Sequence, residues 1–271
     1  MMSPWRYPGG KARLSKTIIA RLPAREWSSF TEPFVGGGGL TFAILPRVVP
    51  GSPIHLNDAD PRVAAWWQVM IGPQARFDQL VEMLSEYTPT VSGFYWHRDN
   101  GLRSGRLVER AFAAMVTNRC AFSGILSGGP IGGNEQRSKY DVGCRYNPTG
   151  LARRHVQARE FLSRYDVRVT SEDFREFLDD APDTEDDLWY LDPPYVRQGP
   201  RLYPTTFDVH DHDELASRVL KTDASWAASY DNDPYVHEKY ADESVSVLGV
   251  NARYTITAKK RMATELLILP D

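Results

Sequence analysis

Apolar and polar positions alternate along the chain in segments that predict strands and helices in turn. Apolar residues at helical spacing predict a helix over residues 11–22, and residues 27–32, which lead into the glycine loop, are interpreted as a short strand. A glycine loop then leads into a second apolar helical segment. The next strand is expected at 54–56, after which Asp60 and Pro61 form a typical helix start. This order favours a parallel sheet with helices on both faces.

The pattern changes over residues 74–164, where helical periodicity continues without strand alternation. One helical stripe there consists of Leu107, Ala111, Phe112 and Met115. Residues 124–147 are rich in Gly, Pro, Ser and Asn, which indicates a hairpin or a long ordered loop. Strand patterns then resume at 167–170, 188–191, 225–229, 245–250 and 265–269. We therefore expect one α/β domain, formed by residues 1–73 and 165–271, that carries a mainly helical insert over 74–164.

Composition excludes several classes of protein. Hydrophobic residues make up 42% of the chain and charged residues 25%, as in ordinary packed domains. Cys120 and Cys144 are too few for a disulfide framework and neither lies in a CxxC pair, which favours the cytoplasm and excludes a cysteine zinc site. No apolar run reaches about 18 residues and the N-terminus does not resemble a signal peptide, so we expect no membrane partner. The histidines lack metal-binding spacing, and no metal is expected.

The net charge of −3 hides an uneven distribution of charge along the chain. Residues 97–169 carry thirteen Lys or Arg and six Asp or Glu, a balance of +7. Residues 171–187 carry nine Asp or Glu and one Arg. Because arginine forms paired hydrogen bonds with phosphates and base edges, the basic segment is typical of a polyanion-binding insert. A solvated helical face fits the same charge pattern.

A glycine loop follows the first predicted strand. Gly36, Gly37 and Gly38 allow the backbone to approach a ligand at the carboxyl end of a strand, where open α/β sheets bind cofactors. No Gly-Lys-Ser/Thr sequence follows, which argues against a P-loop. Asp58, at the end of the next strand, can accept hydrogen bonds from both hydroxyls of a ribose, and the alternative is a turn or helix-cap role. The glycine loop makes the ribose role the better interpretation.

Asp192, Pro193, Pro194 and Tyr195 follow the apolar strand pattern at 188–191. Two successive prolines remove two backbone donors and fix φ, so the chain leaves the sheet as a rigid arm. The Asp192 carboxylate and the Pro193 carbonyl can hold the N–H groups of an exocyclic amine while its ring stacks on Tyr195. Two such acceptors localise the lone pair of an aminopurine amine for attack on an electrophile. A proline-rich turn that only ends a strand is the alternative.

With these motifs in this order, the chain resembles the Dam-like D12 class, alpha group, of DNA adenine-N6 methyltransferases over nearly its whole length. The matching blocks are YPGGK (7–11), EPFVGGG (32–38), LND (56–58), NRCAFSG (118–124), DF (173–174), DPPY (192–195) and ELL (265–267). The resemblance implies a Rossmann-like methyltransferase sheet, S-adenosylmethionine as cofactor, and methyl transfer to adenine N6 in double-stranded DNA. It also implies base flipping, because a stacked adenine cannot present N6.

The resemblance also implies a role for each matched residue. Asp192, Pro193, Pro194 and Tyr195 would bind the target adenine and catalyse transfer. The residues expected to bind the cofactor are Tyr7, Lys11, Glu32, Pro33, Phe34, Gly36, Gly37, Gly38, Asp58, Asp173 and Phe174. The residues of the basic insert expected to contact DNA are Arg119, Ser123, Arg137, Lys139, Arg145, Tyr146, Arg153 and Arg154. We expect residues 123–146 to read the sequence and Arg153 and Arg154 to contact phosphates.

Residues 125–134 differ from the family's short recognition turn, so the resemblance implies adenine methylation without implying GATC as the site. Two alternatives keep the fold: methylation of a protein amide or an RNA base, and a catalytically silent DNA-binding copy. Asp192, where protein-amide enzymes carry Asn, argues against the amide, and the intact motifs argue against the silent copy. We expect a monomer or weak dimer in a prokaryotic or phage-infected cytoplasm, near the nucleoid, which leaves host methylation, phage protection and restriction–modification open.

Overall fold

The computed structural model describes residues 3–6, 10–196, 207–254 and 261–271. Its centre is a seven-stranded sheet with the order β3-β2-β1-β4-β5-β7-β6. The strands are β1 (Ser29–Glu32), β2 (Pro53–Asn57), β3 (Asp166–Thr170), β4 (Asp187–Leu191), β5 (Ser225–Asp231), β6 (Val245–Tyr254) and β7 (Arg261–Pro270). Neighbouring strands from β3 to β5 pair in parallel, whereas β7 is antiparallel to both β5 and β6. The predicted α/β fold with a Rossmann-like sheet is confirmed.

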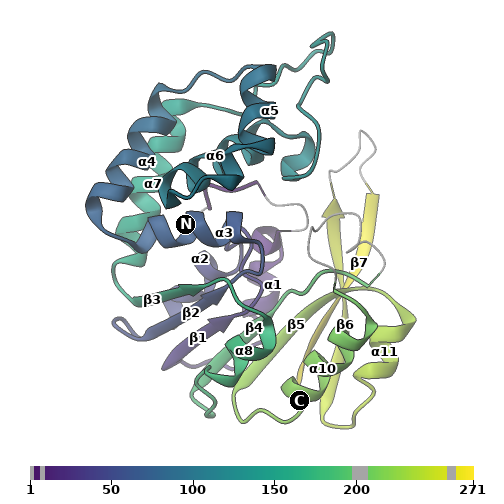
Figure 1. Ribbon diagram of the computed structural model, residues 1–271. Coiled ribbons are helices and arrows are strands. Elements are labelled where there is room, and N and C mark those ends of the chain that lie inside the picture. The colour runs from purple at the N-terminus through teal and green to yellow at the C-terminus, as the bar shows by residue number, and fades with distance from the viewer. Residues whose placement is uncertain (1–2, 7–9, 197–206, 255–260) are drawn as a thin grey trace.

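Helices cover both faces of this sheet (Figure 1). One face packs against α1 (Ser15–Ile19), α2 (Thr41–Ile44) and α3 (Pro61–Ile71), and the other against α8 (Phe174–Asp179), α10 (Val209–Val219) and α11 (Pro234–Lys239). Strand β4 shows the alternation, since Leu188 and Tyr190 belong to the first hydrophobic core and Trp189 and Leu191 to the second. A strand buried on both faces requires such an unbroken apolar run.

Between α3 and β3 the chain forms α4 (Gln74–Glu86), α5 (Val91–Asp99), α6 (Leu107–Cys120) and α7 (Pro148–Leu162), which lie on the α3 side of the sheet (Figure 1). Phe112 and Met115 of α6 belong to the same core as Trp66 of α3. The Trp66 indole N–H donates to His155 Nε2 on α7 at 3.0 Å, while His155 Nδ1 lies 2.8 Å from the Leu151 carbonyl. These contacts attach the inserted helices firmly to the sheet through α3.

The segment between α6 and α7 is a long loop. It contains a 3₁₀ turn at Phe122–Gly124 and no β-strand over residues 121–147, all of which the structure describes. A single bridge joins Ala121 to Pro130. Of the two predicted forms, the long ordered loop is therefore correct and the hairpin is wrong.

Several predicted boundaries change. The helix expected over residues 11–22 is shorter: a 3₁₀ turn at Lys11–Arg13 precedes α1, which ends at Ile19, and Lys11 is buried, with 3% of its surface exposed. The Asp60 cap is confirmed, since its carboxylate accepts the Arg62 backbone N–H at 3.0 Å with Pro61 in the first turn. Strands β6 and β7 extend beyond the predicted apolar runs because they pair with each other over ten residues.

The described part of the chain offers neither a membrane span nor a metal centre. None of the helices in this part has the length and apolar character needed to cross a bilayer. Among the same residues, no three His, Cys, Asp or Glu side chains are grouped in a way that could hold a metal ion.

Candidate active site

The carboxyl ends of the central strands β1 and β4 carry the residues that sequence reasoning singled out. Glu32 is the last residue of β1, and Asp192 directly follows β4, whose five residues are all buried. Pro193 and Pro194 come next and cannot extend the sheet by donating backbone hydrogen bonds. The carboxylate of Asp192 is thereby fixed at the edge of the sheet, with 21% of its side chain exposed.

Lys11 links three side chains at this edge. Its ammonium donates to Asp192 Oδ1 at 2.6 Å and to the Tyr195 hydroxyl at 2.8 Å, and lies 3.8 Å from Glu265 Oε2. The Tyr195 hydroxyl donates to Glu265 Oε1 at 3.0 Å. We call these four residues the catalytic cluster. Burial raises the pKa of Asp192, and the Lys11 ammonium opposes that shift by favouring the ionised carboxylate.

Glu265 is the member of the cluster that sequence reasoning did not select. Because β7 is antiparallel to β5, Glu265 pairs with Asp231 at the carboxyl end of β5 and so lies at the edge where β4 ends. Burial raises the pKa of Glu265 to about 6, and its Oε2 atom is buried without a hydrogen bond. The sequence did contain one signal for Glu265, an acidic residue at the start of the apolar run 265–269. Its partners Lys11 and Tyr195 come from distant segments, so the sequence alone did not connect them.

Glu32 provides another buried carboxyl group beside the cluster. It is 2% exposed and accepts a hydrogen bond from the Thr41 hydroxyl. Burial raises its pKa well above the ordinary value, and the nearby Asp192 charge acts in the same direction. Pro33 is buried and Phe34 partly exposed directly after it, so this short segment forms one wall of the site.

The glycine loop folds back onto the end of β2. Gly36 and Gly38 have positive φ values of 48° and 65°, which glycine adopts without steric cost. A Cβ atom on Gly38 would lie 2.5 Å from the Trp67 ring, and the Trp67 indole donates to the Gly36 carbonyl at 2.9 Å. Gly36, Gly37 and Gly38 are all buried. This loop therefore requires glycine for its geometry and its packing.

Asp58 faces the same loop. Its carboxylate accepts the Gly36 backbone N–H and the Asp60 backbone N–H, both at 2.9 Å. Burial raises the pKa of Asp58 to about 7, and the neighbouring Asp60 charge contributes. Each oxygen of a carboxylate can accept more than one hydrogen bond, so Asp58 keeps capacity for hydroxyl donors.

Asn57, which precedes Asp58, joins three loops through one side chain. Its amide nitrogen donates to the carbonyls of Pro33 and Glu172, at 3.2 and 3.1 Å. Its amide oxygen accepts from the Thr170 hydroxyl and the Glu172 backbone N–H, at 2.8 and 2.9 Å. The carboxyl ends of β1, β2 and β3 are thereby held together.

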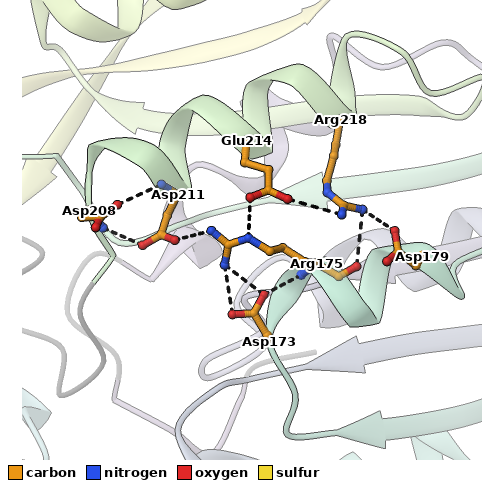
Figure 2. Close-up of polar contacts among 7 residues, drawn as sticks. All are labelled: Asp173, Arg175, Asp179, Asp208, Asp211, Glu214 and Arg218. Carbon is orange, nitrogen blue, oxygen red and sulfur yellow. Dashed lines mark hydrogen bonds and ion pairs between the residues drawn. The ribbon is translucent and has the colours of Figure 1, made fainter.

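Asp173 and Phe174 begin α8, next to these loops. Phe174 is buried and lies 5.7 Å from Phe34 between ring centroids. Asp173 caps α8 by accepting the Arg175 backbone N–H at 2.9 Å, and also pairs with the Arg175 guanidinium at 3.1 Å. Figure 2 shows that Arg175 extends from there to Asp211 and Glu214 of α10. Asp173 therefore has protein partners already, and its contact with a cofactor amine stays a prediction.

The structure separates the predicted DNA-binding residues into two groups. Arg119 and Tyr146 are buried: the Arg119 guanidinium donates to the Arg145 carbonyl at 2.7 and 2.9 Å, and the Tyr146 hydroxyl donates to the Leu84 carbonyl at 3.0 Å. Both side chains hold the loop in place from inside, and their contact with DNA stays a prediction. Ser123 is partly exposed with a positive φ of 56°. The exposed residues are Arg137, Lys139, Arg145, Arg153 and Arg154.

One predicted residue, Tyr7, lies outside the described residues. The catalytic cluster instead brings together Lys11, expected near the cofactor and DNA, with Asp192 and Tyr195, expected at the target base. A carboxylate and a buried ammonium at the carboxyl edge of a parallel sheet can orient an amine, and the glycine loop with Asp58 can hold a ribose.

Comparisons with known proteins identify the family of this chain. The model of the D12 class N6 adenine-specific DNA methyltransferase family matches residues 7–256. The type II methyltransferase M1.LlaDCHI of Lactococcus lactis subsp. cremoris is 26% identical over 217 residues, which cover 77% of this chain and 69% of that protein.

Similar solved structures include a putative RNA methyltransferase of Pyrococcus horikoshii, with a TM-score of 0.43, 10% identity, and coverage of 98% of this chain and 86% of that one. The rRNA methyltransferase aviRa of Streptomyces viridochromogenes has a TM-score of 0.42 and 16% identity, with coverage of 97% and 86%. The family match spans the glycine loop, the insert and the Asp-Pro-Pro-Tyr motif. The chain belongs to the D12 class of N6 adenine-specific DNA methyltransferases.

Proposed function

We propose that this protein binds S-adenosylmethionine, takes a flipped adenine from double-stranded DNA into the catalytic cluster, and methylates its N6 atom at a specific sequence. The observation that carries the proposal is the Lys11–Asp192 pair, held at 2.6 Å directly after the buried strand β4. Its membership of the family and the basic insert support DNA as the substrate. We propose that it acts as a type II enzyme, the class of its relative, in a prokaryotic cytoplasm, and that it works as a monomer or weak dimer.

The residues present fit the cofactor. Asp58 supplies a carboxylate for the ribose hydroxyls, and its hydrogen bond with the Gly36 N–H holds that carboxylate beside the glycine loop. The Asp192 charge adds to the raised pKa of Glu32, and a positively charged ligand beside them would oppose that shift by favouring the ionised carboxylates. S-adenosylmethionine, when bound, supplies a methyl group activated by a positively charged sulfur.

Asp192 orients the target amine. Lys11 is bonded to Oδ1, so Oδ2 is the oxygen that we assign to an N6–H group of the base. The Lys11 ammonium keeps the carboxylate ionised, and an ionised acceptor forms the stronger hydrogen bond. A second acceptor at the Pro193 carbonyl would fix both amine hydrogens, which directs the nitrogen lone pair at the methyl group.

Tyr195 supplies the stacking face for the extruded base. Its hydroxyl accepts from Lys11 and donates to Glu265, and these two bonds fix the orientation of the ring. A base stacked on an aromatic side chain gains about 1–3 kcal/mol, which offsets part of the cost of leaving the duplex. Lys11, Asp192, Tyr195 and Glu265 therefore act together in this proposal.

The decisive experiment incubates the protein with duplex DNA and S-adenosylmethionine and measures N6-methyladenine by mass spectrometry of nucleosides. Asp192→Ala should lower the rate by about 10²–10³-fold or more while cofactor binding persists, because the amine no longer meets an oriented acceptor. Asp186→Ala is the matched control, since Asp186 lies on the acidic turn at the opposite end of β4 with a side chain that is 72% exposed. Full activity of Asp192→Ala would overturn the assigned chemistry, and methylation of RNA or protein alone would overturn the substrate.

A further inference from the structure

Residues 128–134 form a turn in the insert loop between α6 and α7, and we call it the outer turn. Both backbone groups of Ile131 are fixed: its N–H donates to the Cys120 carbonyl at 2.8 Å, and its carbonyl accepts from the Gln136 side chain at 2.8 Å. Cys120 is the last residue of α6, so the middle of the turn is anchored to that helix. Asn134 follows at the exposed end of the turn.

Helix α5 holds both ends of the outer turn. The Tyr95 hydroxyl donates to Asn134 Oδ1 at 2.5 Å. Arg98 lies on the same face of α5, three residues further on. Its guanidinium lies over the Tyr95 ring, 4.7 Å from the ring centroid, and donates to the Gly128 carbonyl at 3.4 Å. Figure 1 shows this loop beside α5, on the side of the insert away from α4 and α7.

The bond from Tyr95 decides which end of the Asn134 amide faces outward. Only the amide oxygen can accept the hydroxyl proton, so Oδ1 is turned toward Tyr95 and Nδ2 lies on the other branch of the amide. Its N–H groups suit the acceptors of the major groove, which are N7 and O6 of guanine, N7 of adenine and O4 of thymine. Cytosine presents an amino donor at the same edge and offers Nδ2 no partner.

The surface around Asn134 has the composition of a DNA-binding surface. Among the residues that the structure describes, three aromatic rings are strongly exposed, and all three lie on α5 or on the insert loop: Trp96, Phe122 and Tyr140. Arg137 and Lys139 follow Asn134 within five residues and are exposed as well. Exposed rings gathered on one part of a protein mark an interaction surface, and bases among them favour nucleic acid as the partner.

We propose that Asn134 is a specificity-determining residue that donates from Nδ2 to a base acceptor within the recognised sequence, and that Tyr95 is the positioning residue that orients its amide. This inference rests on the proposed function, because it names one contact that selects the methylated sequence. Residues 125–134 differ from the family's short recognition turn, so the contact belongs to this chain's own choice of site. A base with an acceptor is favoured at the contacted position, and cytosine is disfavoured there.

The test first maps the adenines that the unaltered protein methylates in genomic DNA, which gives the preferred sequence. Single-turnover methylation is then measured on that duplex and on duplexes with one base pair changed at each position in turn. Asn134→Asp replaces the outward donor with an acceptor, so the preference at one position should move toward cytosine by about tenfold or more. Tyr95→Phe removes only the hydroxyl, and should lower the discrimination at that same position while DNA affinity is kept.

A matched control separates base reading from charge. Asn147→Asp adds the same charge to the insert, and aspartate caps α7 as well as asparagine does, so any loss should be equal on all duplexes. If Asn134→Asp behaves like this control, or keeps the original preference at every position, the role of Asn134 is wrong. Unchanged discrimination in Tyr95→Phe would overturn the role of Tyr95. If the unaltered protein methylates no DNA, the proposed function itself fails.

Discussion

The catalytic cluster and the exposed bases of the insert differ in how their polar side chains are held. In the cluster, Lys11 and Glu265 are each 3% exposed and are joined through Tyr195 by hydrogen bonds of 2.8 and 3.0 Å. On the insert loop, Arg137 pairs with Glu135 at 3.1 Å, but their side chains are 84% and 68% exposed. Exposed pairs contribute about 0–1 kcal/mol, so they exchange partners easily.

This difference separates the two tasks of a sequence-specific enzyme. Groups that orient the reacting amine must keep one geometry, which burial and shared hydrogen bonds provide. Groups that read or follow DNA must give up their own partners for phosphates or base edges, and solvent exposure lowers the cost of that exchange. Arg119 shows that residue type does not decide the matter: it lies in the basic segment, yet burial lowers its pKa to about 10 and its guanidinium binds backbone carbonyls.

The largest effect is expected from removing the ammonium at the centre of the cluster. Lys11→Met leaves Asp192 and Glu265 without their shared cation, which should destabilise the fold by roughly 3 kcal/mol and lower the methylation rate by about 10²-fold at neutral pH. Because Lys11 favours the ionised carboxylate, its removal raises the pKa of Asp192 further, and the remaining activity should increase with pH. Urea unfolding and a pH–rate profile measure both effects.

Lys16→Met is the matched control for that experiment, since Lys16 is exposed on the adjacent helix α1. It should change neither stability nor rate. A Lys11→Met variant with the pH profile of the unaltered protein would contradict the view that the cluster is held by its charges.

The next largest effect concerns the bases of the loop. Replacing Arg137, Lys139 and Arg145 with Ala should change which adenines are methylated, because each side chain that reads a base edge contributes about 1–3 kcal/mol of discrimination. Genome-wide sequencing of methylated sites measures the change. An unaltered site preference in the triple variant would place sequence recognition elsewhere in the chain. It would contradict the view that the exposed bases of the loop read DNA. Lys221→Ala, an exposed residue after α10, serves as the control.

Asp58 sharpens the comparison, because it is a partly buried carboxylate held by backbone donors instead of a cation. The ionised form accepts ribose hydroxyls best, and burial raises the pKa of Asp58 to about 7. S-adenosylmethionine affinity should therefore fall as the pH drops below 7, by up to about tenfold per pH unit. Calorimetry at pH 6 and pH 8 measures this, and binding at pH 6 should release a proton.

In Asp58→Ala the affinity should be lower by about 1.5–3 kcal/mol at pH 8 and should no longer show this pH dependence. If the dependence persists in that variant, another group titrates. Glu265 would then be the first candidate, since the pKa of its carboxyl group is raised to about 6.

The smallest effect is expected on α7. Arg153→Ala and Arg154→Ala should weaken binding to all duplexes alike and lower the slope of log affinity against log salt by about 0.9 for each phosphate contact. Titrations of two unrelated duplexes at several salt concentrations measure the slope. A change in site preference without a change in slope would assign these residues to base reading instead.

The sequence predicts β4 well because this strand is buried on both faces, and its unbroken apolar run leaves few other interpretations. It predicts Asp58 and Asp192 from their places after such runs. It does not predict the cluster around Asp192, since Lys11, which pairs with that carboxylate, and Glu265, which lies beside the Lys11 ammonium, come from opposite ends of the chain. Burial of a charged residue depends on tertiary packing, which no local pattern of charge reveals, and the burial of Arg119 was not predicted for the same reason.

The amide of Asn57 has a thermodynamic consequence for the cofactor pocket. Its two donors and two acceptor sites are all occupied, by the loops that follow β1 and β3. These loops are therefore ordered when the chain folds, and a ligand that enters between them loses little entropy to loop ordering. Affinity for the cofactor can then come from few direct contacts, and association can be fast because no slow rearrangement precedes it.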